Sequence, residues 1–123
     1  MSNIAIILQV VIALGIVNVW IIRRDRATGF RPEGAANIAE EFARYGLSDT
    51  VRRLVGGTKL ALAALLVIGI AYPVLAAGAA AGIAVLMSGA VAAHIKVRDP
   101  FMKSVPALLM LAMSTVVLVA RLG

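Results

Sequence analysis

Four long apolar stretches and two polar segments make up most of this chain of 123 residues. The apolar stretches cover residues 3–22, 54–72, 74–95 and 104–120, and the polar segments cover residues 23–53 and 96–103. Each stretch is close to the ~20 residues that a helix needs to cross the hydrocarbon core of a bilayer. Since backbone groups in lipid must be bonded within their own segment, the pattern predicts helices rather than strands. We therefore expect an all-α fold, an integral membrane four-helix transmembrane bundle that forms a single domain over residues 1–123.

The second and third apolar stretches are separated by almost no polar sequence, so we expect residues 54–95 to form a tight antiparallel helical hairpin. Pro73 is predicted to mark the turn after the second stretch. Ser48 or Asp49 is predicted to cap the helix of that stretch, which would then begin before the hydrocarbon region.

Basic residues lie mostly on one side of this arrangement. Of the 12 Lys and Arg residues, seven lie in residues 23–53 and three in residues 96–103, and Lys59 lies near the same end of its span. With four spans these two segments share one side of the membrane, which the positive-inside rule makes cytoplasmic. We therefore expect both termini outside, where Arg121 is the one basic residue.

The first apolar stretch is expected to be a retained helix rather than a cleaved signal peptide. No positive charge precedes it, and no cleavage site of small residues follows it. Trp20, near its end, is predicted to be an anchor at the membrane interface.

Composition and charge exclude several classes of site. The chain is 62% hydrophobic, has a formal net charge of +6 and contains no Cys, which excludes disulfides, iron–sulfur clusters and thiolate metal sites. A single histidine, His94, excludes haem held by two histidines of one chain. Because the basic residues flank apolar spans, we expect them to attract anionic lipid head groups at the cytoplasmic face, and we expect no nucleic acid partner.

The first polar segment contains a predicted short amphipathic helix. Within residues 33–45, Ile38, Phe42 and Tyr45 recur at helical spacing, and charged residues occupy the other faces. We expect this helix to lie in the cytoplasmic interface between the first two spans and to stop at Gly46. A linker helix packed over the bundle is favoured over an element that docks a partner.

Each predicted span carries a polar residue near its cytoplasmic end, namely Asn18, Lys59, His94 and Ser104. At a rise of 1.5 Å per residue, all four lie within roughly 8 Å of that boundary. One interpretation is a polar pocket, open to the cytoplasmic leaflet, that binds a lipid head group or a quinone ring. In the other interpretation, Lys59 extends to the interface and His94 caps a helix end.

The candidate ligand-binding residues are therefore Asn18, Lys59, His94 and Asp99. Three acidic residues could pair with the buried Lys59, and the sequence does not choose among Asp99, Glu40 and Glu41. Gln9 precedes Asn18 by nine residues, so their side chains point to opposite faces of the first helix, and at least one of them faces away from a shared cluster.

Small residues on the third span, Gly78, Gly82 and Gly89, are candidates for close helix packing. Packing inside this bundle is favoured over a homodimer face. No Ser–His–Asp set, carboxylate pair or phosphate-binding loop is present in the spans. We therefore expect no catalytic residue and no metal site, and we favour a role other than that of an enzyme.

The order of residues resembles the DoxX-like family of small four-span bacterial membrane proteins over roughly residues 42–118. The match includes F-x-x-x-G at Phe42–Gly46, G-x-x-K-L-x-L-A from Gly56 to Ala63, the set Met87, Ala90, His94 and Asp99, and P-A-L-L at Pro106–Leu109.

The resemblance implies a four-helix membrane bundle in a bacterial cytoplasmic membrane. The family name comes from a subunit of a quinone-linked sulfur oxidoreductase, and relatives are also described in redox complexes and as assembly or chaperone factors. Many relatives carry an acidic residue where this chain has Lys59, so any role of that carboxylate does not carry over.

Three functions follow as hypotheses. The first is a non-catalytic accessory subunit or assembly factor of a larger membrane complex, with a membrane protein or a second copy of the chain as partner. The second is a quinone- or lipid-binding subunit of a membrane oxidoreductase, with quinone as the one cofactor considered. The third is a small-molecule exporter, which is disfavoured because no carboxylate lies within the spans.

Overall fold

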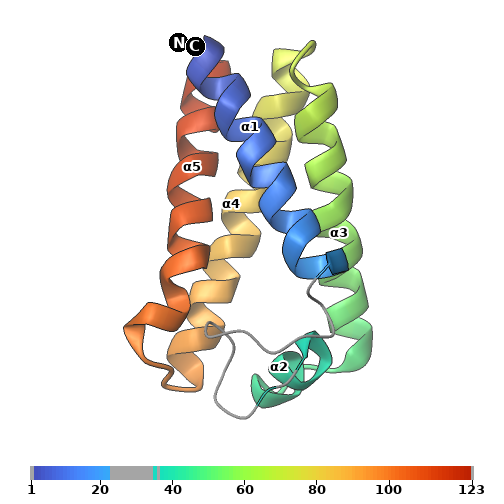
Figure 1. Cartoon of the computed structure of the whole chain (residues 1–123), viewed down its shortest axis with the longest axis vertical. Coiled ribbons are helices and arrows are strands. Elements are labelled where there is room, and N and C mark those ends of the chain that lie inside the picture. Colours follow the sequence, from blue (N-terminus) through green and yellow to red (C-terminus); the bar gives the residue numbers. More distant parts are fainter. Residues whose placement is uncertain (1, 23–34, 36, 123) are drawn as a thin grey trace.

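Four long helices run side by side in the computed structural model, which describes residues 2–22, 35 and 37–122 (Figure 1). These are α1 (Ser2–Val17), α3 (Asp49–Ile68), α4 (Pro73–Lys96) and α5 (Val105–Leu122). The short helix α2 (Ile38–Arg44) lies at one end of the bundle, and the outer ends of α1 and α5 lie together at the other (Figure 1). Within the described residues the expected all-α fold is confirmed.

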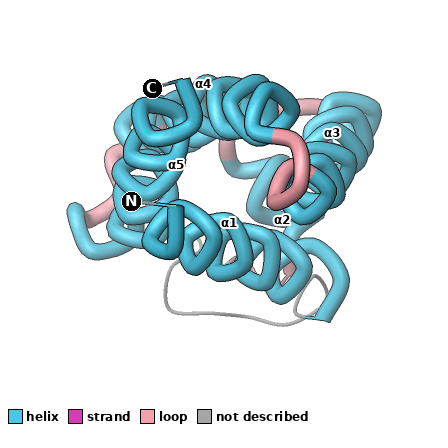
Figure 2. Tube along the Cα trace, turned by 90° about the horizontal axis from the view of Figure 1, so that it is seen from above, coloured by secondary structure: helices cyan, strands magenta, loops and turns pink. Residues whose placement is uncertain are grey.

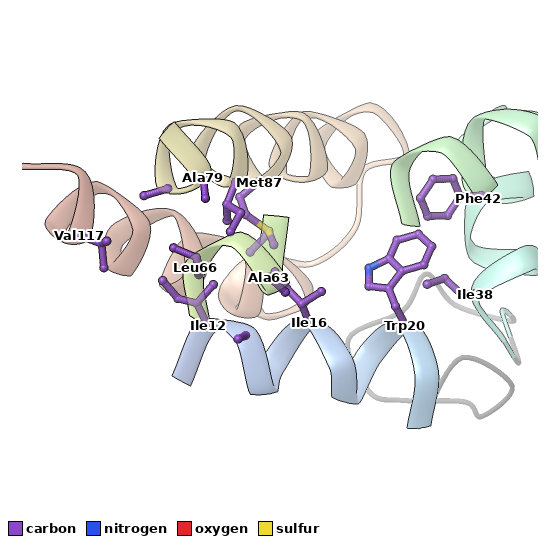
Figure 3. Packing of buried hydrophobic residues seen from close by; sticks show 14 residues of the cluster. Ile12, Ile16, Trp20, Ile38, Phe42, Ala63, Leu66, Ala79, Met87 and Val117 are labelled. Carbon is purple, nitrogen blue, oxygen red and sulfur yellow. The ribbon is translucent and has the colours of Figure 1, made fainter. Parts of the chain in front are cut away.

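The four long helices form a ring when the bundle is viewed from its end, in the order α1, α5, α4 and α3 (Figure 2). Each helix packs against its two neighbours in this ring. Aliphatic side chains from all four helices are fully buried between them. They include Ile12, Leu66 and Val117 (Figure 3) and also Ile83 of α4. The apolar interior separates the two ends of the bundle.

Three helical stretches are long and apolar enough to cross a bilayer: Asn3–Ile22, Pro73–Lys96 and Phe101–Leu122. The third of these includes a 3₁₀ turn, Phe101–Ser104, that leads into α5. Large apolar side chains are exposed on the outer faces of these helices, which suits contact with lipid. The chain is thus an all-helical membrane protein.

Helix α3 is less apolar than the other three long helices because Arg52, Arg53 and Lys59 lie in its first half. It nevertheless runs alongside α1 and α4 (Figure 1). The crossing that the hydrophobic pattern predicts for residues 54–72 stays a prediction.

The predicted helix ends around α2 are largely confirmed. Asn37 caps α2 by accepting a hydrogen bond from the Glu40 N–H at 2.9 Å, and Gly46 follows the helix with a φ of 77°. That left-handed conformation suits glycine and ends the helix. The Ser48 hydroxyl caps α3 by accepting from the Val51 N–H at 3.2 Å. The predicted range 33–45 starts earlier than α2, and residues 33, 34 and 36 lie outside the described residues.

The hairpin of α3 and α4 is confirmed, but its turn lies earlier than predicted. Helix α3 ends at Ile68, the chain turns over residues 69–72, and Pro73 is the first residue of α4 rather than a residue of the turn. Proline is favoured at this position because the first N–H groups of a helix have no intrahelical partner.

Candidate functional site

A buried lysine lies at the end of the bundle that α2 covers. Lys59 projects from α3 and is only 8% exposed. Its ammonium nitrogen lies 5.4 Å from the centre of the Trp20 ring, within the range of a cation–π interaction. Of the three acidic residues considered as partners, Glu41 is the one whose charge acts on Lys59. Within the described part of the chain, the interactions found for the Lys59 ammonium are therefore the Trp20 ring and the charge of Glu41.

Trp20 reaches the interior because of local features on two helices. It lies in a π-helical turn, Asn18–Ile22, that continues α1, and it is 9% exposed. On α3, a Cβ added to Gly56 would lie 2.5 Å from the indole ring, so glycine leaves the space that the ring fills. The predicted role of Trp20 as an anchor at the membrane interface is therefore wrong, because the ring packs inward against Gly56.

A row of aromatic rings lies between Lys59 and His94, the second polar residue at this end of the bundle. Trp20 and Phe42 meet edge to face with centroids 5.6 Å apart (Figure 3). Phe42 and Tyr45 also meet edge to face, with centroids 6.0 Å apart. Tyr45 then meets the ring of His94 at 5.6 Å. Phe42 and Tyr45 belong to the apolar stripe predicted for α2, and both are buried. The expected packing of this helix over the bundle is confirmed, whereas its position in a membrane interface stays a prediction.

His94 and Asp99 form the second polar group. The Nδ1 atom of His94 lies 2.7 Å from Oδ2 of Asp99, and both side chains are less than 10% exposed, at 9% and 7%. The turn between them holds the pair together, because the Asp99 N–H donates to the His94 carbonyl at 3.0 Å and Arg98 adopts a φ of 58°. Lys96 donates to the Tyr45 carbonyl at 2.8 Å, which ties this turn to the end of α2.

The carboxylate of Asp99 determines what the His94 ring can do. An ionised carboxylate accepts only, so Nδ1 carries a proton and Nε2 of a neutral ring is left as an acceptor. The Tyr45 hydroxyl lies 3.4 Å from each ring nitrogen. Tyr45, His94 and Asp99 thus form a set of groups that can hold or pass a proton.

The predicted site residues are only partly brought together. His94 and Asp99 are in contact, and Lys59 is separated from them by three aromatic rings. Asn18 is half-buried in the π-helical turn and makes no hydrogen bond to Lys59, His94 or Asp99 within the described part of the chain. We define the polar end as Trp20, Tyr45, Lys59, His94 and Asp99.

Tyr45 was not among the predicted ligand-binding residues. A usable signal was present, since Tyr45 continues the buried stripe of α2 toward a polar layer that already contained His94. An aromatic residue with a hydroxyl at the end of an apolar stripe is suited to meet a buried polar group.

The three glycines predicted for helix packing have different surroundings. A Cβ on Gly82 would lie 3.1 Å from the Leu62 side chain, so this position packs within the bundle against α3. Added Cβ atoms on Gly78 and Gly89 would meet no described atom within 4 Å, and both residues are exposed. Only Gly82 thus fits the favoured interpretation of packing inside the bundle.

Within the described residues, no group of three His, Cys, Asp or Glu side chains is placed to hold a metal ion. A comparison with protein-family models matches residues 30–117 to the DoxX-like family. No curated protein and no solved structure matches the chain. The matched range contains α2, α3, α4 and all of the polar end except Trp20, and it covers well over half of the sequence. This chain therefore belongs to the DoxX-like family.

Proposed function

We propose that the chain crosses a bacterial cytoplasmic membrane four times, with the polar end toward the cytoplasm. Three apolar stretches and the parallel course of α3 support four crossings. Arg44 of α2, Lys96 at the end of α4 and Lys103 of the 3₁₀ turn lie at the same end of the bundle as the residues of the polar end, which fits the positive-inside rule. Both termini then face away from the cytoplasm.

The ligand proposed for the polar end is the head group of a quinone, as part of a membrane oxidoreductase. The observation that carries this proposal is the buried side chain of Lys59, whose ammonium faces Trp20 and makes no hydrogen bond to a described residue. A buried cation without an acceptor is costly in a membrane, and a carbonyl oxygen would satisfy its donors.

The other residues of the polar end suit the same ligand. Trp20 and Phe42 supply aromatic rings next to Lys59, and a flat ligand ring could join their edge-to-face packing. Tyr45 and His94 carry groups that can donate or accept a proton near a quinone oxygen, and Asp99 fixes the orientation of the imidazole. When bound, a quinone would supply two-electron redox chemistry, and these side chains would bind it and handle its protons.

Quenching of Trp20 fluorescence provides a direct test, because Trp20 is the single tryptophan of the chain. The purified protein is titrated in detergent with a short-chain ubiquinone, and saturable quenching is expected. In a Lys59→Ala, His94→Ala double variant the apparent affinity should fall about tenfold or more, since two hydrogen bonds to the quinone oxygens are lost.

Arg53→Ala is the matched control for this titration. Arg53 is an exposed cation on the same helix, and its partner is the surface carboxylate of Asp49. This variant should bind quinone like the unaltered protein. Equal quinone affinity in the double variant and the unaltered protein would contradict the proposed ligand.

A second candidate function is that of a non-catalytic accessory subunit or assembly factor. It is favoured by the exposed positions of Gly78 and Gly89 on the outer face of α4, where another helix could approach closely. Purification from native membranes in mild detergent should recover a second membrane protein, and Gly89→Leu should weaken that association. Recovery of the chain alone as a monomer would argue against this role.

Export of small molecules is the least supported of the three functions. The acidic residues of the chain lie in the segments between the predicted spans. Asp99, the acidic residue of the polar end, is bonded to His94. A proton-coupled exporter needs an ionisable carboxylate within the membrane, and the spans contain none.

A further inference from the structure

A second polar cluster lies at the opposite end of the bundle, where α1 and α5 meet. Gln9 on α1 is fully buried, and its side-chain oxygen accepts a hydrogen bond from Nε of Arg121 on α5 at 2.8 Å. Its Nε2 atom donates to the Leu66 carbonyl on α3 at 2.7 Å. One amide side chain thus joins three helices away from the polar end.

The bond to Leu66 explains why Gln9 is needed by the fold. Helix α3 ends at Ile68, and the Ile70 N–H bonds to the Val67 carbonyl instead of continuing the helical pattern to Leu66. The Leu66 carbonyl is therefore one of the last carbonyls of the helix that have no intrahelical donor. Gln9 supplies that donor, so its amide orientation is fixed and its oxygen is directed to Arg121.

The bond to Gln9 does not give every nitrogen of the Arg121 guanidinium a hydrogen-bond partner. Its Nη2 atom is buried and has no hydrogen-bond partner. The described acidic residues, Glu40, Glu41, Asp49 and Asp99, lie in α2, at the start of α3 and after α4, at the other end of the bundle. An arginine that extended to the membrane surface would keep its nitrogens accessible, whereas Arg121 turns toward the buried Gln9.

We propose that Arg121, positioned by Gln9, forms a binding site for a phosphate oxyanion at this end of the bundle. Arg121 as a whole is half-buried, so a phosphate at the exposed side of its planar guanidinium would supply the missing negative charge. The phosphate belongs either to the head group of an anionic phospholipid, with its chains along the exposed apolar faces of α1 and α5, or to soluble inorganic phosphate. This site is independent of the polar end and of the quinone proposed there.

Native mass spectrometry of the full chain in detergent tests the site with two probes, dioleoylphosphatidylglycerol and inorganic phosphate. The unaltered protein should bind one of the two. Preferential binding of the phospholipid assigns the lipid source, and preferential binding of inorganic phosphate assigns the soluble source. In Arg121→Gln the affinity for the bound probe should fall about tenfold or more, because the charge-assisted hydrogen bond is lost.

Two further variants keep the test decisive. Thr115→Ala alters an exposed position on α5 whose hydroxyl donates to its own helix backbone, and it should leave binding unchanged. Gln9→Glu keeps Arg121 and places a carboxylate beside it. This internal negative charge should compete with the phosphate and lower its affinity about tenfold. The variant therefore tests the site even if Arg121→Gln fails to fold. Failure of the unaltered protein to bind either probe, or unchanged binding in Arg121→Gln and Gln9→Glu, would overturn the proposal.

Discussion

Each end of this bundle holds a cation that packs against the helices, but the two ends compensate its charge in different ways. At the polar end, Lys59 lies against Trp20, and the charge of Glu41 on α2 acts on it. At the opposite end, Arg121 has a neutral amide as its partner, and no helix comparable to α2 covers that end in the described residues (Figure 1). The comparison shows that α2 brings both a cover and a counter-charge to one end only.

The two ends also differ in the contacts that stabilise them. The bonds of Gln9 join α1, α3 and α5 directly, so that end depends on one side chain. The polar end depends on several packed rings and on the turn after α4. A substitution of Gln9 should therefore destabilise the fold more than a substitution of any single residue of the polar end.

The largest loss of stability is expected for Gln9→Leu. The substitution leaves the Leu66 carbonyl and the Arg121 Nε without partners in a buried position, which should destabilise the bundle by about 3 kcal/mol. Unfolding in mixed micelles of dodecylmaltoside and SDS measures this change. Val11→Ala, an exposed position on the same helix, should cost less than about 0.5 kcal/mol. Equal effects of the two substitutions would remove the proposed role of Gln9.

Gly56→Ala should destabilise the polar end by about 1–3 kcal/mol, because the new methyl group collides with the Trp20 ring. Gly57→Ala is the matched control, since a Cβ there meets no described atom within 4 Å. It should be neutral or stabilise the helix by up to about 1 kcal/mol. The same unfolding assay, together with the emission maximum of Trp20, distinguishes the two. Identical emission in both variants would show that the indole does not pack on Gly56.

The coupling free energy between His94 and Asp99 should be smaller than the loss expected for Gln9→Leu. A double-mutant cycle with His94→Ala and Asp99→Ala should give about 1–2 kcal/mol. The short contact and low exposure of both side chains are the reason for expecting a measurable value. A parallel cycle between His94 and Ser114, a buried serine on α5 that bonds its own helix backbone, should give a value near zero. Additive effects of His94→Ala and Asp99→Ala would mean that the contact contributes nothing to the fold.

The smallest effect on stability is expected for a substitution at the exposed start of α3, outside the proposed span. A hydrogen bond from Arg52, aided by the charges of Arg52 and Arg53, lowers the pKa of Asp49 below its ordinary value of 3.8. A lowered carboxyl pKa contributes stability above the unfolded value, and that contribution is lost as the pH falls through the lowered pKa. Arg52→Gln should raise the Asp49 pKa, measured by carbon NMR of the carboxyl group, with little change in stability near neutral pH. An unchanged pKa would exclude the Arg52 contact.

Local features of the fold could be predicted because they depend on neighbouring residues. The stop at Gly46, the cap by Ser48 and the inward stripe of α2 follow from short-range rules, and the structure confirms them. Gln9 and Asn18 were expected on opposite faces of the first helix, and Gln9 is fully buried whereas Asn18 is half-buried. The turn before Pro73 was placed too late, because proline fits both a turn and the start of a helix.

Contacts between distant helices could not be predicted in the same way. Lys59 had three candidate acidic partners, and choosing Glu41 requires the position at which α2 returns to the bundle. The bonds from Gln9 to Leu66 and Arg121 cross 57 and 112 positions of sequence. No local pattern encodes such pairings, since they depend on how the helices are arranged around the ring.

The central claim is that α3 crosses the membrane, so that the two ends lie on opposite sides. The chain contains no Cys, so single cysteines can be introduced without removing others. Tyr72→Cys lies in the exposed turn after α3, whereas Arg44→Cys and Met102→Cys lie near the polar end. In intact cells, a membrane-impermeant maleimide should label Tyr72→Cys and should reach the other two only after permeabilisation. Labelling of Tyr72→Cys and Arg44→Cys from the same side would contradict the claim.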